Sequence, residues 1–162
     1  MPDIYAFLDQ HKINYQRFDH PAVFTCEDAD KLDLNMPGVS IKNLFLRDKN
    51  AKRHFLVVIS TNKKADLKAL SQTINLSKLS FGSPESLKQH LGVEPGSVTL
   101  LGLINDPNKE IEVLIDQELQ DKALQCHPLI NTASLVIPAE DIKKFLEITG
   151  HATKFIEIPE RA

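Results

Sequence analysis

Apolar and polar residues follow one another along this chain in short blocks, a pattern that predicts strands and helices of modest length. A short helix is predicted near the N-terminus, because Ile4, Phe7, Leu8 and His11 recur with the spacing of one helix face. Blocks rich in aliphatic and aromatic residues predict strands over 14–19, 41–47, 54–60, 97–104, 110–115, 132–137 and 155–158. The chain is therefore expected to contain about seven strands and about five helices.

Helix-start and helix-stop residues lie between these strands. The candidate caps are side-chain acceptors that suit a helix start and glycines that suit its end: Thr25 (with Asp28 three residues later), Asp66, Ser83, Gly92 and Gly150. Residues 138–149 carry the clearest amphipathic pattern, and Gly150 follows them directly.

The order of the elements favours a mixed α/β fold of the α+β kind. Strands occur as adjacent pairs, 41–47 with 54–60 and 97–104 with 110–115, each joined by a short polar turn. Such pairs are typical of a mixed or antiparallel sheet with helices packed outside it. Since no repeat or low-complexity linker divides the chain, residues 1–162 are expected to form a single domain.

The composition is that of a globular protein, with 42% hydrophobic and 25% charged residues in 162. The 19 basic and 22 acidic residues give a formal charge of −3, which excludes a globally basic nucleic-acid coat and leaves room for a local basic patch. Basic side chains do gather around the first hairpin: Arg47, Lys49, Lys52, Arg53, His54, Lys63, Lys64 and Lys68. They could bind a phosphate backbone, and a solvated hairpin tip explains them equally well.

Cysteine use and the absence of a hydrophobic leader predict a cytoplasmic protein. Cys26 and Cys126 are far apart and form no CxxC pair, so both are interpreted as small buried residues in a reducing compartment. The N-terminus has no signal-peptide pattern, and no apolar run approaches the ~18 residues of a membrane span.

Several familiar catalytic motifs are missing from the sequence. GxGxxG, GxxxxGK[ST], HExxH and GxSxG do not occur, so dinucleotide, Walker-type, zinc-protease and esterase-elbow sites are not expected. The two cysteines are too far apart for a local zinc clip, and neither a metal nor a cofactor is predicted.

Two segments carry groups that suit a polar ligand. After the Pro95-Gly96 turn, the N–H groups of Gly96, Ser97 and Val98 could face a carbonyl oxygen or an oxyanion, or the segment could be a plain turn before a strand. Residues 127–132 place His127 and Asn131 before a strand, where they could bind a substrate or simply satisfy local backbone groups.

Lys42 lies within an otherwise apolar strand. Alternation places it on one face with Leu44 and Leu46, and places Asn43 on the opposite face. A lysine in such surroundings either extends its ammonium group to water at an edge or serves a site.

Seven segments occur in the order of a known family: 42–48, 53–58, 66–70, 79–85, 92–99, 102–106 and 127–133. With them the chain resembles the YbaK/prolyl-tRNA synthetase-associated editing superfamily, most of all its free-standing alanyl-tRNA(Pro) deacylase branch. The resemblance extends from residue 19 to residue 150, nearly the whole chain. Several ordered motifs together are far more specific than any one of them.

The resemblance implies a central, barrel-like, mostly antiparallel sheet surrounded by helices, and hydrolysis in trans of the ester in mischarged alanyl-tRNA(Pro). It implies that Lys42 holds the 3′ end of the tRNA and that Gly96 and its neighbours bind the ester carbonyl. A ribose hydroxyl of the substrate is implied to help activate water, so no metal or cofactor is required. The implied substrate-binding residues are Asn43, Ser97, Val98, His127, Asn131 and Thr25.

The resemblance also sets the expected partners and leaves alternatives. Mischarged tRNA(Pro) is the expected partner and prolyl-tRNA synthetase a candidate one, with no role for DNA or membranes. A deacylase for cysteine or serine on tRNA, or a non-catalytic module that binds tRNA or a synthetase, are the alternatives. One departure concerns Leu100, which stands where the family's glycine loop has a proline and so leaves the loop less restrained.

Overall fold

The computed structural model describes residues 3–20, 37–94, 98–129 and 132–161. Its strands are β1 (Gln16–Asp19), β2 (Val39–Asp48), β3 (His54–Ser60), β4 (Leu79–Phe81), β5 (Ile111–Asp116), β6 (Leu124–Cys126), β7 (Ala133–Ile137) and β8 (Thr153–Ile156). Its helices are α1 (Ile4–Gln10), α3 (Leu67–Thr73), α4 (Pro84–Leu91) and α5 (Ala139–Thr149), with 3-10 helices η2 (Leu100–Asn105) and η3 (Gln117–Leu119). The expected mixed α+β fold is confirmed.

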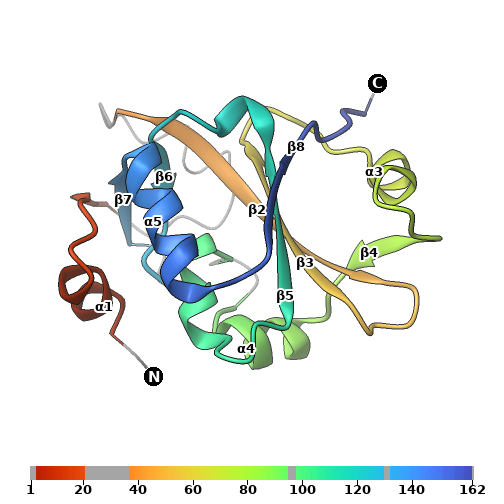
Figure 1. Cartoon of the computed structure of the whole chain (residues 1–162), viewed down its shortest axis with the longest axis horizontal. Coiled ribbons are helices and arrows are strands. Elements are labelled where there is room, and N and C mark those ends of the chain that lie inside the picture. The colour runs from red at the N-terminus through yellow and green to blue at the C-terminus, as the bar shows by residue number, and fades with distance from the viewer. Residues whose placement is uncertain (1–2, 21–36, 95–97, 130–131, 162) are drawn as a thin grey trace.

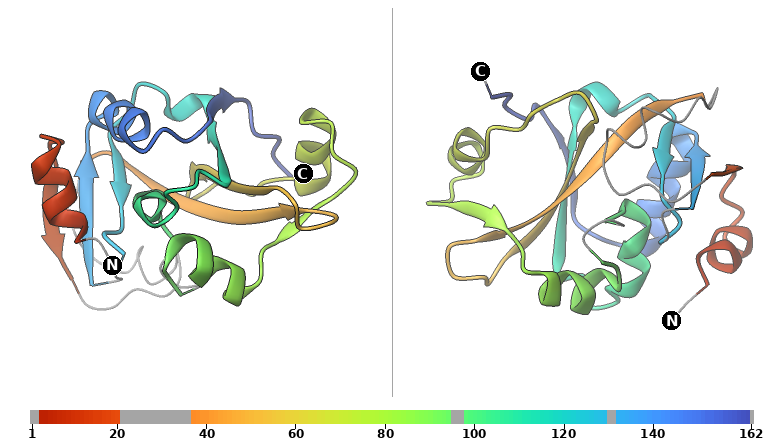
Figure 2. Two further views of the ribbon diagram at one scale, coloured as in Figure 1. Left: turned by 60° about the horizontal axis from the view of Figure 1, so that its bottom comes forward. Right: turned by 180° about the vertical axis from the view of Figure 1, so that it is seen from behind.

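One eight-stranded mixed sheet organises the molecule, in the order β1-β7-β6-β2-β3-β5-β8, with β4 beside β2. Among the described strands, four pairings are antiparallel and three are parallel. In this part of the chain β1 and β8 are edge strands, so the sheet curves without closing into a barrel. Helices α1 and α5 lie at the β7 end, and α3 lies with β4 at the other end (Figures 1 and 2).

The long strand β2 is central to this arrangement. It pairs with β3 over most of its length, with β6 through Val39 and Ser40, and with β4 through Leu46–Asp48. Lys42 and Asn43 therefore lie on the stretch of β2 between its β6 and β4 partners.

The predicted alternation of β2 is confirmed, because each face packs into a different hydrophobic cluster. Ile41 and Phe45 belong to the larger cluster, which includes residues of α4 and α5. Leu46 belongs to the smaller cluster with Leu70 of α3, and Leu44 packs against it. A strand that is buried on both faces carries apolar residues at successive positions. The polar pair Lys42-Asn43 is therefore unusual within β2.

The predicted strand over 97–104 and its pairing with 110–115 are wrong. Residues from Leu100 to Asn105 form η2, and β5 instead pairs with β3 in parallel. The side chains of Leu100, Leu101 and Leu103 are buried, and periodicity alone cannot separate a buried strand from a buried helical turn in so short an apolar run. The short strands β4 and β6 were not predicted.

The helix caps agree with the sequence wherever they are described. The side chains of Asp66 and Ser83 accept backbone N–H groups of the first turns of α3 and α4. Gly92 and Gly150 end α4 and α5 in the left-handed conformation that favours glycine. The predicted Thr25 cap lies outside the described residues. None of the described helices is long and apolar enough to cross a membrane.

Candidate active site

The parallel pairing of β2 with β6 brings together the chain segments that carry two predicted site residues. Ser40 pairs with Gln125, and Lys42 and His127 each follow two residues later. The parallel ladder ends at the pair Ser40–Gln125, so the chain segments that lead to Lys42 and to His127 leave it from the same place. Lys42 and His127 are 85 positions apart in the sequence, and this tertiary pairing brings their segments together.

Lys42 and Asn43 place two chemically different polar groups on the stretch of β2 between its β6 and β4 partners. The Lys42 side chain is half-buried, and within the described ranges its ammonium group has no carboxylate partner. In the same part of the chain, Oδ1 of Asn43 is buried and accepts no hydrogen bond. A buried amide oxygen without a donor costs free energy unless a ligand supplies one. The pair thus presents a cation and an unused acceptor on the two faces of one strand.

His127 is a mostly buried residue that directly follows β6. Burial is the main cause that lowers the pKa of His127; the nearby His20 lowers it further, and the bond to the Ala133 carbonyl opposes both. Its Nδ1 lies 3.5 Å from that carbonyl oxygen. Nε2 of His20 lies 2.9 Å from Oγ of the buried Ser134. The imidazole of His127 is therefore neutral at neutral pH and suits a polar, uncharged contact.

A hydroxyl ties the His127 segment to the chain that follows Val98. Oγ1 of Thr99 donates to the carbonyl oxygen of His127 at 2.6 Å, and Thr99 is fully buried. Val98 packs against the larger hydrophobic cluster. The structure thus brings together three segments of the prediction: the one with Lys42 and Asn43, the one with Val98 and the one with His127.

The other predicted site residues, Thr25, Gly96, Ser97 and Asn131, lie outside the described residues. The structure adds Thr99, His20 and Ser134, which the sequence did not single out individually. For Thr99 a signal existed, since a threonine before an apolar run is a typical helix N-cap. The neighbourhood of His20 and Ser134 depends on the antiparallel pairing of β1 with β7, for which no local signal exists.

The basic residues around the first hairpin are partly neutralised. Arg53 makes two hydrogen bonds of 2.8 Å to the carboxylate of Glu112 in β5. Lys63 forms an ion pair with the buried Asp116 at 2.5 Å. Lys49 and Lys52 at the tip are exposed. The patch is thus weaker than its sequence suggests.

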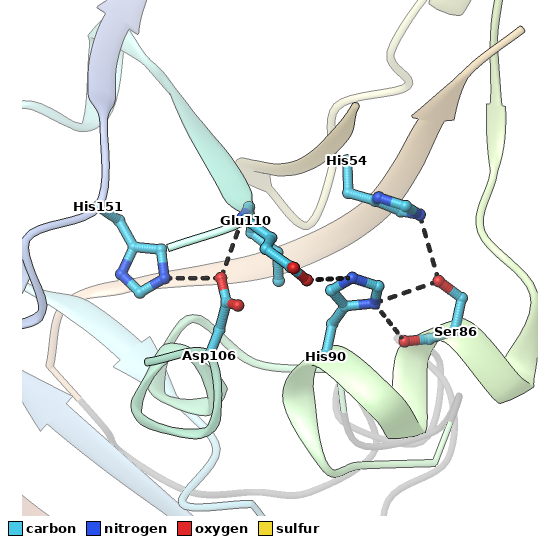
Figure 3. A network of polar contacts seen from close by, with 7 residues as sticks. His54, Ser86, His90, Asp106, Glu110 and His151 are labelled. Carbon is cyan, nitrogen blue, oxygen red and sulfur yellow. Dashed lines mark hydrogen bonds and ion pairs between the residues drawn. The ribbon is translucent and has the colours of Figure 1, made fainter. Parts of the chain in front are cut away.

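A second polar network lies around α4, and it is formed by His54, Ser86, His90 and Glu110 (Figure 3). Ser86 Oγ lies 3.2 Å from Nε2 of His54, and His90 contacts Ser86 through Nδ1 and Glu110 through Nε2. Burial and then the electrostatic interaction with the neighbouring His90 lower the pKa of His54. The described residues contain no group of three or more His, Cys, Asp or Glu side chains placed to hold a metal ion.

Cys126 is buried, in agreement with its interpretation as a small core residue. Burial raises the pKa of its thiol to about 12, which makes it a poor nucleophile. Cys26 lies outside the described residues.

Comparison with known proteins identifies a family. The aminoacyl-tRNA editing domain matches residues 20–145. The prolyl-tRNA editing protein ProX of Acetoanaerobium sticklandii is 38% identical over 156 residues, which cover 96% of this chain and 95% of ProX. The prolyl-tRNA synthetase associated domain-containing protein 1 of Danio rerio is 33% identical over 152 residues, which cover 92% of this chain and 82% of that protein.

Solved structures share the fold at much lower identity. The crystal structure of a proposed trans-editing enzyme for prolyl tRNA synthetase superposes with a TM-score of 0.69 at 17% identity and covers 99% of both chains. The crystal structure of a hypothetical protein superposes with a TM-score of 0.73 at 15% identity and covers 97% of this chain and 99% of that one.

Proposed function

The chain belongs to the aminoacyl-tRNA editing domain family and is an aminoacyl-tRNA deacylase, and from this premise we propose that its substrate is alanyl-tRNA(Pro). The similarity to ProX, a prolyl-tRNA editing protein, over nearly the full length of both chains supports tRNA(Pro) as the tRNA. Alanine is proposed as the amino acid because the segments that carry the sequence resemblance belong to the alanyl-tRNA(Pro) deacylase branch.

The observation that supports the site most directly is the position of Lys42, two residues past the pairing of β2 with β6, with no carboxylate among the described residues to neutralise its cation. The 3′ end of a charged tRNA carries a phosphate at the terminal adenosine, and a lysine binds phosphate as a compact point charge. In our proposal Lys42 holds this phosphate, which fixes the ester near the segments that contain Gly96 and His127.

Hydrolysis requires water to attack the ester carbonyl while the ribose oxygen leaves. Backbone N–H groups at Gly96, Ser97 and Val98 are proposed to stabilise the oxyanion of this step. A ribose hydroxyl of the substrate is proposed to orient the water, and the proton that the water loses passes to the ribose oxygen that leaves. This mechanism needs no side-chain nucleophile. The thiol of Cys126 is buried and protonated, so it is not suited to act as one.

Asn43 and His127 are proposed to recognise the substrate. The buried Oδ1 of Asn43 can accept a hydrogen bond from the α-ammonium group or from a ribose hydroxyl. The neutral His127 forms one wall of the amino-acid pocket, and Asn131 and Thr25 are proposed to complete it. A prolyl-tRNA synthetase that supplies the mischarged tRNA is the proposed partner, with the cytoplasm as the proposed compartment.

A panel of mischarged tRNAs tests the substrate. Alanyl-, seryl- and cysteinyl-tRNA(Pro) are compared with alanyl-tRNA(Ala), without any added metal beyond the magnesium that folds the tRNA. Fastest deacylation of alanyl-tRNA(Pro) supports the proposal. Because pockets separate small side chains by only about 1–3 kcal/mol, faster hydrolysis of the seryl or cysteinyl ester would reassign the amino acid. Binding of tRNA(Pro) without any hydrolysis would contradict the deacylase.

A further inference from the structure

Thr99 is a fully buried polar residue that uses its hydroxyl group twice. Oγ1 donates to the carbonyl oxygen of His127 at 2.6 Å and accepts the backbone N–H of Leu101 at 3.2 Å. The carbonyl oxygen of Thr99 also accepts the N–H of Gly102 at 3.0 Å. Its backbone is extended, with φ −149° and ψ 144°, as is usual for the residue that caps a helix.

The helix that Thr99 caps also holds the end of α4. Nδ2 of Asn105, the last residue of η2, donates to the carbonyl oxygen of Leu91 at 2.7 Å. Gly102 packs so closely on Leu91 that an added Cβ would lie 3.2 Å from its Cβ and carbonyl oxygen. η2 therefore contacts the end of α4, which precedes the glycine loop in the sequence, and begins directly after Val98 and Thr99, which follow that loop.

Resting on the proposed function, we propose that Thr99 is a positioning residue for the deacylation. Its hydroxyl sets the distance between the segment that follows the glycine loop and the His127 wall. These two segments come from distant parts of the chain, and Thr99 joins them by one short side-chain bond. The width between them determines which aminoacyl side chain fits while the ester carbonyl is held in place.

Removal of the hydroxyl group has a defined physical consequence. Valine has nearly the shape of threonine, but it leaves the carbonyl of His127 and the N–H of Leu101 without their partner. Both groups are then free to shift toward other partners, which changes the position of the His127 segment. A misplacement near 1 Å is enough to reduce catalysis by about a hundredfold.

The test is a series at one position, Thr99→Ser, Thr99→Cys and Thr99→Val. Serine keeps a strong donor, whereas cysteine differs from serine by one atom and donates only weakly. The matched control is Ser71→Ala in α3, which removes another buried hydroxyl group with a 2.6 Å bond, to the carbonyl of Lys68, on the other side of the sheet. Folding of every variant is checked by circular dichroism and thermal melting.

We expect kcat to fall by about tenfold or more in the cysteine and valine variants, with a smaller change in KM for the tRNA. The ratio of alanyl to seryl deacylation is expected to change in the same variants, to return with serine, and to stay constant in Ser71→Ala. The comparison uses whichever mischarged tRNA the unaltered enzyme hydrolyses fastest, so a substrate other than alanyl-tRNA(Pro) contradicts the proposed substrate without affecting this test. A folded cysteine or valine variant with unaltered kcat and selectivity would overturn the role of Thr99.

Discussion

Ser40 of β2 pairs with Gln125 of β6 in parallel register, and the segments that carry Lys42 and His127 both continue from this pair. Two segments that lie far apart in the sequence become neighbours because two strands run in the same direction. The site is thus built where a long central strand leaves one partner, β6, before it reaches the next, β4.

Replacement of Asn43 by leucine tests whether this residue contributes to deacylation or to the stability of the fold. The buried Oδ1 has no donor among the described residues, so a side chain of similar shape without polar atoms is expected to leave the melting temperature unchanged or to raise it. The same change removes an acceptor that we assign to the substrate, and kcat/KM is expected to fall about tenfold or more. Thermal melting and deacylation are measured on Asn43→Leu and on Asn50→Leu at the exposed hairpin tip. Lower stability of Asn43→Leu with normal kcat/KM would show a structural role instead.

Leu100→Pro tests the missing proline of the glycine loop. Leu100 is the first residue of η2, where the N–H group has no partner within the helix, and Thr99 already has the extended conformation that precedes proline. Proline also restricts the unfolded chain, which is worth about 0.4–1 kcal/mol. Alanine at the same buried position is expected to cost about 2–5 kcal/mol.

We therefore expect Leu100→Pro to fold and to melt above Leu100→Ala in the same buffer. A proline variant less stable than the alanine variant would mean that the N–H of Leu100 is needed.

His127 makes folding sensitive to acid. Its pKa is lowered in the folded protein, mainly by burial, so the unfolded chain takes up the proton first as the pH falls. Stability is complete above the ordinary histidine pKa of about 6.5 and decreases as the pH falls toward the lowered value. His54 contributes in the same direction.

When the pH is lowered from about 7.5 to about 5.5, the melting temperature of His127→Gln is expected to fall less than that of the unaltered protein. His11→Gln, at the end of α1, is the control. An equal acid-induced loss in the His127 variant and the unaltered protein would contradict the assignment.

Much of the fold followed from local patterns. The alternation of β2 was predictable because its two faces pack against two hydrophobic clusters. The apolar residues that make these contacts are close together in the sequence. The caps at Asp66 and Ser83 were predictable because a side-chain acceptor before an amphipathic run is a local signal. Lys42 could be singled out for the same reason, as the charged residue in an apolar strand.

The rest depends on contacts between distant segments. The parallel partners of β3 and β6 are chosen by global packing, which no short window of sequence contains. η2 was mistaken for a strand because its apolar run is buried on all sides. The bond from Thr99 to His127 could not be foreseen, since it joins residues 28 positions apart.

The most direct test of the account compares the rate of alanine release from alanyl-tRNA(Pro) by the unaltered enzyme, by Lys42→Ala and by Lys154→Ala. Lys154 is an exposed strand lysine in β8, at the far edge of the sheet, and serves as the matched control. Loss of a charged contact to phosphate is worth about 1.5–3 kcal/mol, so Lys42→Ala is expected to slow release by at least about tenfold while its circular dichroism spectrum stays unchanged. Lys154→Ala is expected to match the unaltered enzyme. Normal release by a folded Lys42→Ala variant would contradict the central claim that Lys42 holds the substrate at the junction of β2 and β6.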